Sequence, residues 1–128
     1  KETVVTDKTP LPFKPTPFAA AVKCNGMVYV SGSLGMDAKT EKMIEGTVYD
    51  RTNKVALTNL SGVLEDAGTS LQNIVKANVY LKDMADFSEM NRAYMEFFPG
   101  DYIPARTCVQ VAGLPLGTDV EIECTAHL

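Results

Sequence analysis

The feature that most constrains the fold is an alternating segment that lies between two helical patterns. Apolar and polar residues alternate over 74–82, which predicts a half-buried strand. Before it, apolar residues recur at spacings of three and four over 48–67, behind an N-cap residue at Thr47. After it, a second helix is predicted to begin at Asp86, with Glu89 completing a capping box. Each of these helices has a single apolar face, and a strand separates them. We therefore expect a crossover with both helices on one face of a mixed sheet.

The other strands are predicted near the two ends of the chain. Asn25-Gly26 lies between apolar runs at 18–23 and 27–31, which is a strong hairpin signal because type I′ turns need two positive φ angles. Residues 106–112 and 120–127 alternate as well and predict two further strands. The expected fold class is therefore α+β, in a single domain spanning all 128 residues.

The first 17 residues predict an extended arm rather than a packed element. Four of the seven prolines lie there, and proline removes a backbone donor and fixes φ. A short edge strand at residues 3–5 is expected before the arm follows the surface.

Two of the predicted strands also present continuous apolar faces. One consists of the odd-numbered residues over 75–81, and the other of the even-numbered residues over 122–128. Two helices are few for covering this area, so we expect part of the sheet to be buried between subunits.

Composition and charge exclude several classes of protein. With 45% hydrophobic and 22% charged residues, the chain is neither disordered nor collagen-like, and no apolar run reaches the roughly 18 residues that cross a bilayer. The net charge is −4 and the 12 Lys and Arg residues are scattered, which argues against nucleic-acid binding. Three cysteines without a CxxC spacing, and the single histidine His127, predict neither a metal site nor a disulfide framework. We expect the cytoplasm, or alternatively the mitochondrial matrix, because the chain begins at Lys1 and an upstream leader could have been removed.

An arginine stands at the start of the first C-terminal strand. Arg106 shares one face of that strand with Cys108 and Gln110, and burying it without a partner is costly. Two interpretations stay open: a structural ion pair, or a fork that binds the carboxylate of a ligand. Cys108 has no histidine nearby in sequence to activate it, so a structural thiol beside a pocket is preferred over a nucleophile.

The polar face of the last strand carries Glu121 and Glu123. Either alone is typical of a solvated surface charge, which is our interpretation of Glu123, whereas Glu121 stands out by its nearness to the turn at 114–119. In a plain hairpin of the last two strands, Arg106 would lie opposite Ala126 and roughly 16 Å from Glu121. Either another strand order applies or the pocket combines two chains, and we favour a shared pocket.

Asn91 is the polar member of the apolar stripe on the second helix. A buried amide must find hydrogen-bond partners. The preferred interpretation is a bond to neighbouring backbone, and the alternative is that Asn91 orients a pocket wall.

These motifs resemble the RidA family, also called the YjgF family, of imine deaminases. The resemblance extends from about Thr9 to Leu128. It rests on Pro104-Ala105-Arg106-x-Cys108-Val109, Leu114-Pro115, Val120-Glu121-Ile122-Glu123 and Val30-Ser31-Gly32, supported by segments 75–83 and 87–98.

The resemblance implies a chorismate-mutase-like fold and a homotrimer with a central β-barrel and clefts between subunits. It also implies hydrolysis of 2-imino or enamine acids, such as 2-aminoacrylate and 2-aminocrotonate, to 2-ketoacids and ammonia, without metal or cofactor. Arg106 would hold the substrate carboxylate, and Glu121 would position or activate the attacking water. The implied substrate-binding residues are Phe18, Ser31, Gly32, Asn91, Arg106 and Cys108.

Two positions depart from the family pattern. Thr16-Pro17-Phe18 stands where many members have Gly-Pro-Tyr, so the aromatic ring is kept and the phenol hydroxyl is lost. Ser33 stands where glutamine is common. Two alternatives to a deaminase are therefore kept: an endoribonuclease acting on single-stranded RNA, and a non-enzymatic regulatory protein that binds small carboxylates.

Overall fold

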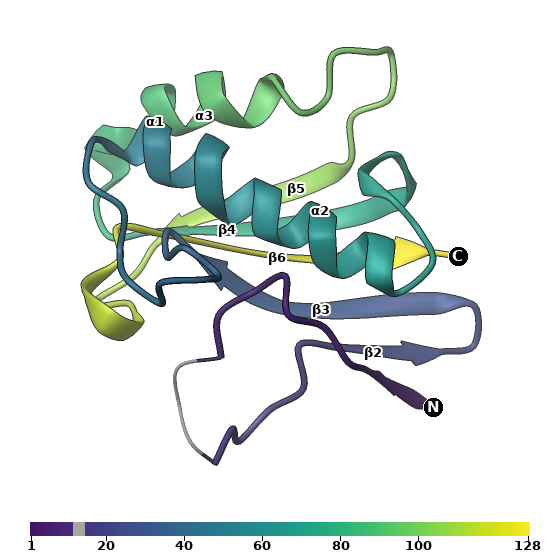
Figure 1. Cartoon of the computed structure of the whole chain (residues 1–128). Coiled ribbons are helices and arrows are strands. Elements are labelled where there is room, and N and C mark those ends of the chain that lie inside the picture. The colour runs from purple at the N-terminus through teal and green to yellow at the C-terminus, as the bar shows by residue number, and fades with distance from the viewer. Residues whose placement is uncertain (12–14) are drawn as a thin grey trace.

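The computed structural model describes residues 1–11 and 15–128, whose six strands form one mixed sheet (Figure 1). The strand order is β1-β2-β3-β6-β4-β5, so the last strand in sequence occupies the centre. β4 and β5 are parallel, and the other neighbours are antiparallel. The bounds are β1 Glu2–Val4, β2 Ala21–Cys24, β3 Met27–Leu34, β4 Ile74–Leu81, β5 Ala105–Gln110 and β6 Val120–His127.

Both long helical segments cover the same face of this sheet, as Figure 1 shows. The first is continuous through α1 (Val48–Asp50), a π-helical segment (Arg51–Ala56) and α2 (Leu57–Asp66), and the second is α3 (Phe87–Met95). Short 3₁₀ turns occur at Leu71–Asn73, Met84–Asp86 and Pro115–Gly117. The predicted α+β class, with two helices on one face of a mixed sheet, is confirmed. The trimer and its barrel remain predictions.

The N-terminal hairpin follows its sequence signal. Asn25 and Gly26 have φ values of 52° and 76°, as a type I′ turn requires. The edge strand expected at residues 3–5 is β1, one residue earlier, and it pairs with β2.

The first helix differs from its prediction because of the π-helical segment. Each wider π turn rotates the residues that follow around the helix axis. Within and directly after this segment, Val55 and Leu57 are buried in addition to the residues of the regular stripe. Before it, Val48 is buried, whereas Tyr49, which the regular spacing placed on the apolar stripe, is only half-buried.

The cap predicted for the second helix is wrong by one turn. Asp86 makes no capping hydrogen bond through its side chain. The carboxylate of Asp83 instead accepts a hydrogen bond from the Ala85 N–H at 2.9 Å, at the start of the 3₁₀ turn that leads into α3.

We expected apolar residues of the strands now seen as β4 and β6 to be buried between subunits. The helices of the same chain already cover most of these residues. Ala77, Val79, Leu81 and Ile122 are fully buried within the chain, while a β-bulge between Ile74 and Lys76 leaves Val75 43% exposed. Leu128, expected on the same apolar side, is 53% exposed. The uncovered face is mainly polar, with Tyr29 and Val109 as its large exposed apolar side chains.

Candidate functional site

A recess of about 280 Å³ lies at the edge of β3, where its neighbour β2 stops. β2 pairs with β3 only as far as Val30. On that side of β3, Ser31–Leu34 therefore have the N-terminal arm as their neighbour, while β6 remains paired on the other side. Four of the residues implied by the resemblance line this recess: Phe18, Ser31, Gly32 and Glu121. We call it the Glu121 recess.

The observed position of the Glu121 side chain requires a glycine at position 32. A β-carbon added to Gly32 would lie 2.1 Å from Glu121 Oε1 and 2.7 Å from Cδ, distances that no pair of non-bonded atoms tolerates. The register shift between Val30 and Ser33 brings this backbone against β6. Ser31 binds the N-terminal arm to β3, because its hydroxyl donates a hydrogen bond to the Ala19 carbonyl oxygen at 2.6 Å.

The charges around Glu121 favour its protonated form. Burial raises the pKa of the Glu121 carboxyl, and the neighbouring Glu123 raises it further. The interpretation of Glu123 as a solvated surface charge is wrong, since it accepts hydrogen bonds from the Tyr80 hydroxyl and from Asn78 Nδ2. The bond to Glu123 and burial together raise the pKa of Tyr80 to about 12, so Tyr80 stays a donor.

Arg106 lies in a second, shallow depression of about 370 Å³, with Asn91, Tyr94, Met95 and Ile103. We call this the Arg106 depression. The guanidinium lies 4.8 Å from the centre of the Tyr94 ring, and Nη1 contacts Met90 Sδ at 3.8 Å. Among the described residues Arg106 has no ion-pair partner, so the structural ion pair considered for it does not form within the chain.

The neighbours of Arg106 carry unused polar groups. Oδ1 of Asn91 is buried and accepts no hydrogen bond from the described part of the chain, which contradicts the preferred interpretation of a bond to neighbouring backbone. The hydroxyl of Tyr94 is likewise unpartnered, and burial raises its pKa to about 12. Cys108 packs against the core, and burial raises the pKa of its thiol, which is expected of a structural cysteine.

Arg106 and Glu121 do not meet within one chain. The predicted alternative of a different strand order is correct, because β4 lies between β5 and β6. Arg106 is level with Ala77 and Cys124, three residues along β6 from Glu121. Two strand spacings and three residues separate their Cα atoms by roughly 14 Å. One chain therefore presents two separate half-sites.

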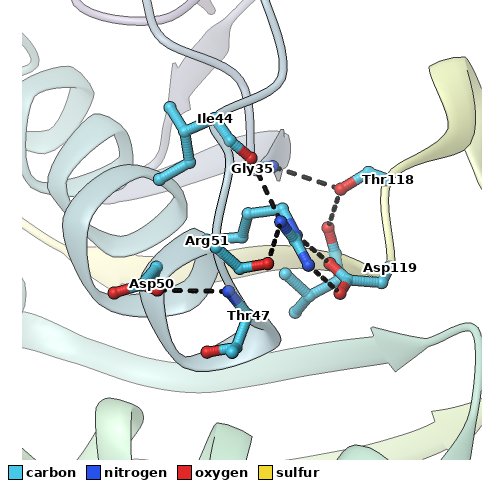
Figure 2. Close-up of polar contacts among 9 residues, drawn as sticks. Gly35, Ile44, Thr47, Asp50, Arg51, Thr118 and Asp119 are labelled. Atoms are coloured by element: carbon cyan, nitrogen blue, oxygen red, sulfur yellow. Dashed lines mark hydrogen bonds and ion pairs between the residues drawn. The ribbon is translucent and has the colours of Figure 1, made fainter.

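Sequence reasoning missed an ion pair that holds the start of β6. Arg51 Nε and Nη2 donate to Asp119 Oδ1 and Oδ2, both at 2.7 Å, and Nη1 donates to the carbonyl oxygens of Ile44 and Gly46 (Figure 2). This bidentate geometry is the strong form of an arginine–carboxylate contact. The partners are 68 residues apart, and no local pattern connects them.

A second contact fixes the same corner. The Gly35 N–H donates to the hydroxyl of Thr118, which is 1% exposed and donates to the Val120 carbonyl oxygen (Figure 2). Thr118 thus joins the end of β3 to the start of β6, and the Arg51 pair fixes that start to the first helical segment. β3 and β6 are the two strands on which Gly32 and Glu121 meet.

Clustered metal ligands and membrane-spanning helices are both absent from residues 1–11 and 15–128. In that part of the chain no three His, Cys, Asp or Glu side chains gather as metal ligands. No helix there is long and apolar enough to cross a membrane.

Known proteins match this chain over nearly its whole length. The family model for endoribonuclease L-PSP matches residues 11–128. A goat protein named 2-iminobutanoate/2-iminopropanoate deaminase is 43% identical over 86% of this chain and 79% of its own. Reactive Intermediate Deaminase A of Arabidopsis thaliana, named as chloroplastic, is 40% identical over the whole of this chain and 66% of its own.

The solved structures agree with the sequence comparisons. The crystal structure of Escherichia coli TdcF with bound serine superposes with a TM-score of 0.91 at 32% identity, covering 100% of this chain and 99% of that one. The Rid-family protein YyfA of Yersinia pestis has a TM-score of 0.92 at 31% identity, over 99% and 98% of the two chains. The chain belongs to the RidA/YjgF family, which the matching model describes as endoribonuclease L-PSP.

Proposed function

We propose that this protein hydrolyses 2-imino acids and their enamine tautomers to 2-ketoacids and ammonia, at sites shared between copies of the chain. The observation that carries the proposal is the separation of opposite charges into two half-sites. The Glu121 recess carries Glu121 and Glu123, and the Arg106 depression carries a guanidinium without a carboxylate partner among the described residues.

A protonated 2-imino acid has matching charges. It carries a carboxylate at one end and an iminium cation two atoms away. The guanidinium of Arg106 offers parallel donors to the carboxylate. Glu121, contributed by a neighbouring copy, would lie beside the iminium carbon and nitrogen.

The reaction needs proton transfer and positioning, which these residues supply. Glu121 takes a proton from water while the water oxygen bonds to the iminium carbon and the carbon–nitrogen π electrons move to nitrogen. The resulting carbinolamine receives that proton on nitrogen, the carbon–nitrogen bond breaks, and its electron pair leaves with ammonia. The hydroxyl oxygen becomes the ketone oxygen as its proton passes through Glu121 to the ammonia. The net change is iminium plus water to ketone plus ammonium. General acid–base help of this kind contributes about 10²- to 10⁴-fold.

Three observations support the proposed reaction. The pKa of Glu121 is raised by burial and by Glu123, which makes its carboxylate a stronger base than that of an ordinary glutamate. The relative TdcF was crystallised with bound serine, whose α-carboxylate and nitrogen resemble those of a 2-imino acid. The deaminase names of two relatives point to the same substrate class.

Assembly follows from the same geometry. We infer a homotrimer in which one copy's Arg106 depression meets the next copy's Glu121 recess, since head-to-tail contacts that close into a ring give equivalent sites. The resemblance to RidA favours three subunits around a central barrel. The cysteines are free thiols, which fits a reducing compartment such as the cytoplasm or the mitochondrial matrix.

The activity is tested by adding the protein to a dehydratase that generates 2-aminoacrylate from serine. We expect faster pyruvate release, and a loss of about 10²-fold or more in Arg106→Ala and in Glu121→Gln. Lys54→Ala is the matched control, because its exposed ion pair with Asp50 lies outside both half-sites. Unchanged pyruvate release with the wild-type protein would contradict the proposal.

The two alternatives appear as other outcomes of the same experiment. Binding of pyruvate without any acceleration would indicate a carboxylate-binding regulatory protein. Cleavage of single-stranded RNA that is lost in Arg106→Ala would indicate the endoribonuclease of the family description. The net charge of −4 and the paired carboxylates of the Glu121 recess oppose that outcome.

A further inference from the structure

The Glu121 recess continues beyond the residues that the proposed reaction uses. Part of its wall is formed by Pro10 and Leu11 of the arm and by Leu60 and Val63 of α2. The arm is held over α2 by Thr6, whose hydroxyl donates to Asp66 Oδ2 at 2.6 Å. We call this apolar part of the recess the side compartment.

One polar group that lines the recess lacks a hydrogen-bond partner among the described residues. Ser33 is 3% exposed and lines the recess, yet its hydroxyl makes no hydrogen bond with any described residue. A buried hydroxyl left without a hydrogen-bond partner carries an unfavourable desolvation free energy. A ligand atom that can bond to Ser33 would recover this free energy.

The recess is also larger than the smallest 2-imino acids need. Its volume of about 280 Å³ exceeds the roughly 150 Å³ that holds a benzene molecule in an engineered protein cavity. The methyl or methylene group of an alanine- or serine-derived substrate would leave most of that space unused. Glu121 and Glu123, which also line the recess, disfavour acidic side chains by like-charge repulsion.

We infer that the side compartment binds the side chain of the substrate, and that it selects 2-imino acids with an aromatic side chain bearing a hydroxyl group. The ring packs against Leu11, Leu60 and Val63, and its hydroxyl pairs with Ser33. The inference rests on the proposed deaminase function and adds the identity of the preferred substrates.

The test uses an amino-acid oxidase to generate imines from alanine, phenylalanine and tyrosine in the presence of semicarbazide, which traps them. The protein competes with the trap, so its kcat/KM for each imine follows from the decrease in semicarbazone. We expect about tenfold or higher kcat/KM for the aromatic imines than for the alanine-derived one, since burying the additional apolar carbons of the ring is favourable. We also expect the tyrosine-derived imine to exceed the phenylalanine-derived one.

Two variants test the compartment itself. Ser33→Ala is expected to lower the tyrosine-to-phenylalanine ratio of kcat/KM by about three- to tenfold, the effect of one hydrogen bond. Leu11→Phe, which fills the compartment, is expected to lower the aromatic-to-alanine ratio. Ser88→Ala, an exposed serine on α3, is the matched control and should keep both ratios.

The outcomes separate the two proposals. No acceleration of any imine contradicts the deaminase function itself. Acceleration of the alanine-derived imine without preference for aromatic imines, or ratios that Ser33→Ala leaves unchanged, overturns the side compartment alone. Because each readout is a ratio between substrates of one variant, a partly unfolded preparation does not mimic the expected result.

Discussion

Arg106 and Glu121 lie on opposite faces of the same sheet. Arg106 stands directly beside the buried Ala77, so its side chain points to the helix-covered face, where it meets Tyr94 of α3. Glu121 stands beside Tyr80, whose hydroxyl bonds to Glu123 on the uncovered face. A ligand of a few atoms cannot touch both residues of one chain, so the proposed reaction requires a second copy.

The pH dependence of activity should respond to Glu123. Glu123 raises the pKa of the Glu121 carboxyl through like-charge repulsion, and the base form of Glu121 is lost as pH falls through that pKa. Glu123→Gln removes the charge and keeps an oxygen that can accept from Tyr80. We expect the acid limb of the kcat/KM profile to move to lower pH, while Glu65→Gln, an exposed residue outside the Glu121 recess, leaves it in place. An unmoved limb in Glu123→Gln would show that another group titrates.

The close approach of Gly32 to Glu121 predicts a local effect of one methyl group. In Gly32→Ala the new β-carbon displaces Glu121, so we expect kcat to fall by about 10²-fold, because misplacement by about 1 Å has that effect on catalysis. Gly113→Ala is the control, since a β-carbon there meets nothing within 4 Å. Steady-state kinetics and a thermal melt of both variants check this. Equal activities would mean that the position of Glu121 is not critical.

The Arg51–Asp119 pair is expected to stabilise the fold more than the other ion pairs. The two side chains are 17% and 22% exposed, so Arg51→Ala leaves a partly buried carboxylate without its partner. We expect a loss of about 2 kcal/mol in the free energy of unfolding. Lys54→Ala removes a 68%-exposed partner and should cost about 0.5 kcal/mol or less. Urea denaturation compares the two, and equal losses would contradict the assignment.

The elements that local chemistry determines could be predicted from the sequence. The Asn25-Gly26 turn needs two positive φ angles, and few residue pairs other than Asn-Gly adopt them readily. The bounds of β6 are those of its alternating pattern, 120–127. Its even-numbered residues from Val120 to Ala126 are buried as the period of two requires.

The remaining features depend on contacts between distant segments. The insertion of β4 between β5 and β6 is a tertiary choice, and a hairpin of the last two strands was equally compatible with their alternation. The π-helical segment adds Val55 and Leu57 to the buried stripe of the first helix, and the bulge exposes Val75 at the end of an otherwise buried stripe. No local period shows either effect. Predicting a pocket shared between chains required both the strand spacing and the resemblance, and its test lies outside a single chain.

The most direct test of the shared site is complementation between two inactive variants. Arg106→Ala and Glu121→Gln are purified separately, mixed in equal amounts, unfolded in urea and refolded together. If Arg106 of one copy works with Glu121 of the next, random assembly makes about one quarter of the sites intact, and we predict that fraction of wild-type imine hydrolysis. Activity that stays at the level of the separate variants, in a mixture shown by mass spectrometry to contain mixed oligomers, would contradict the account.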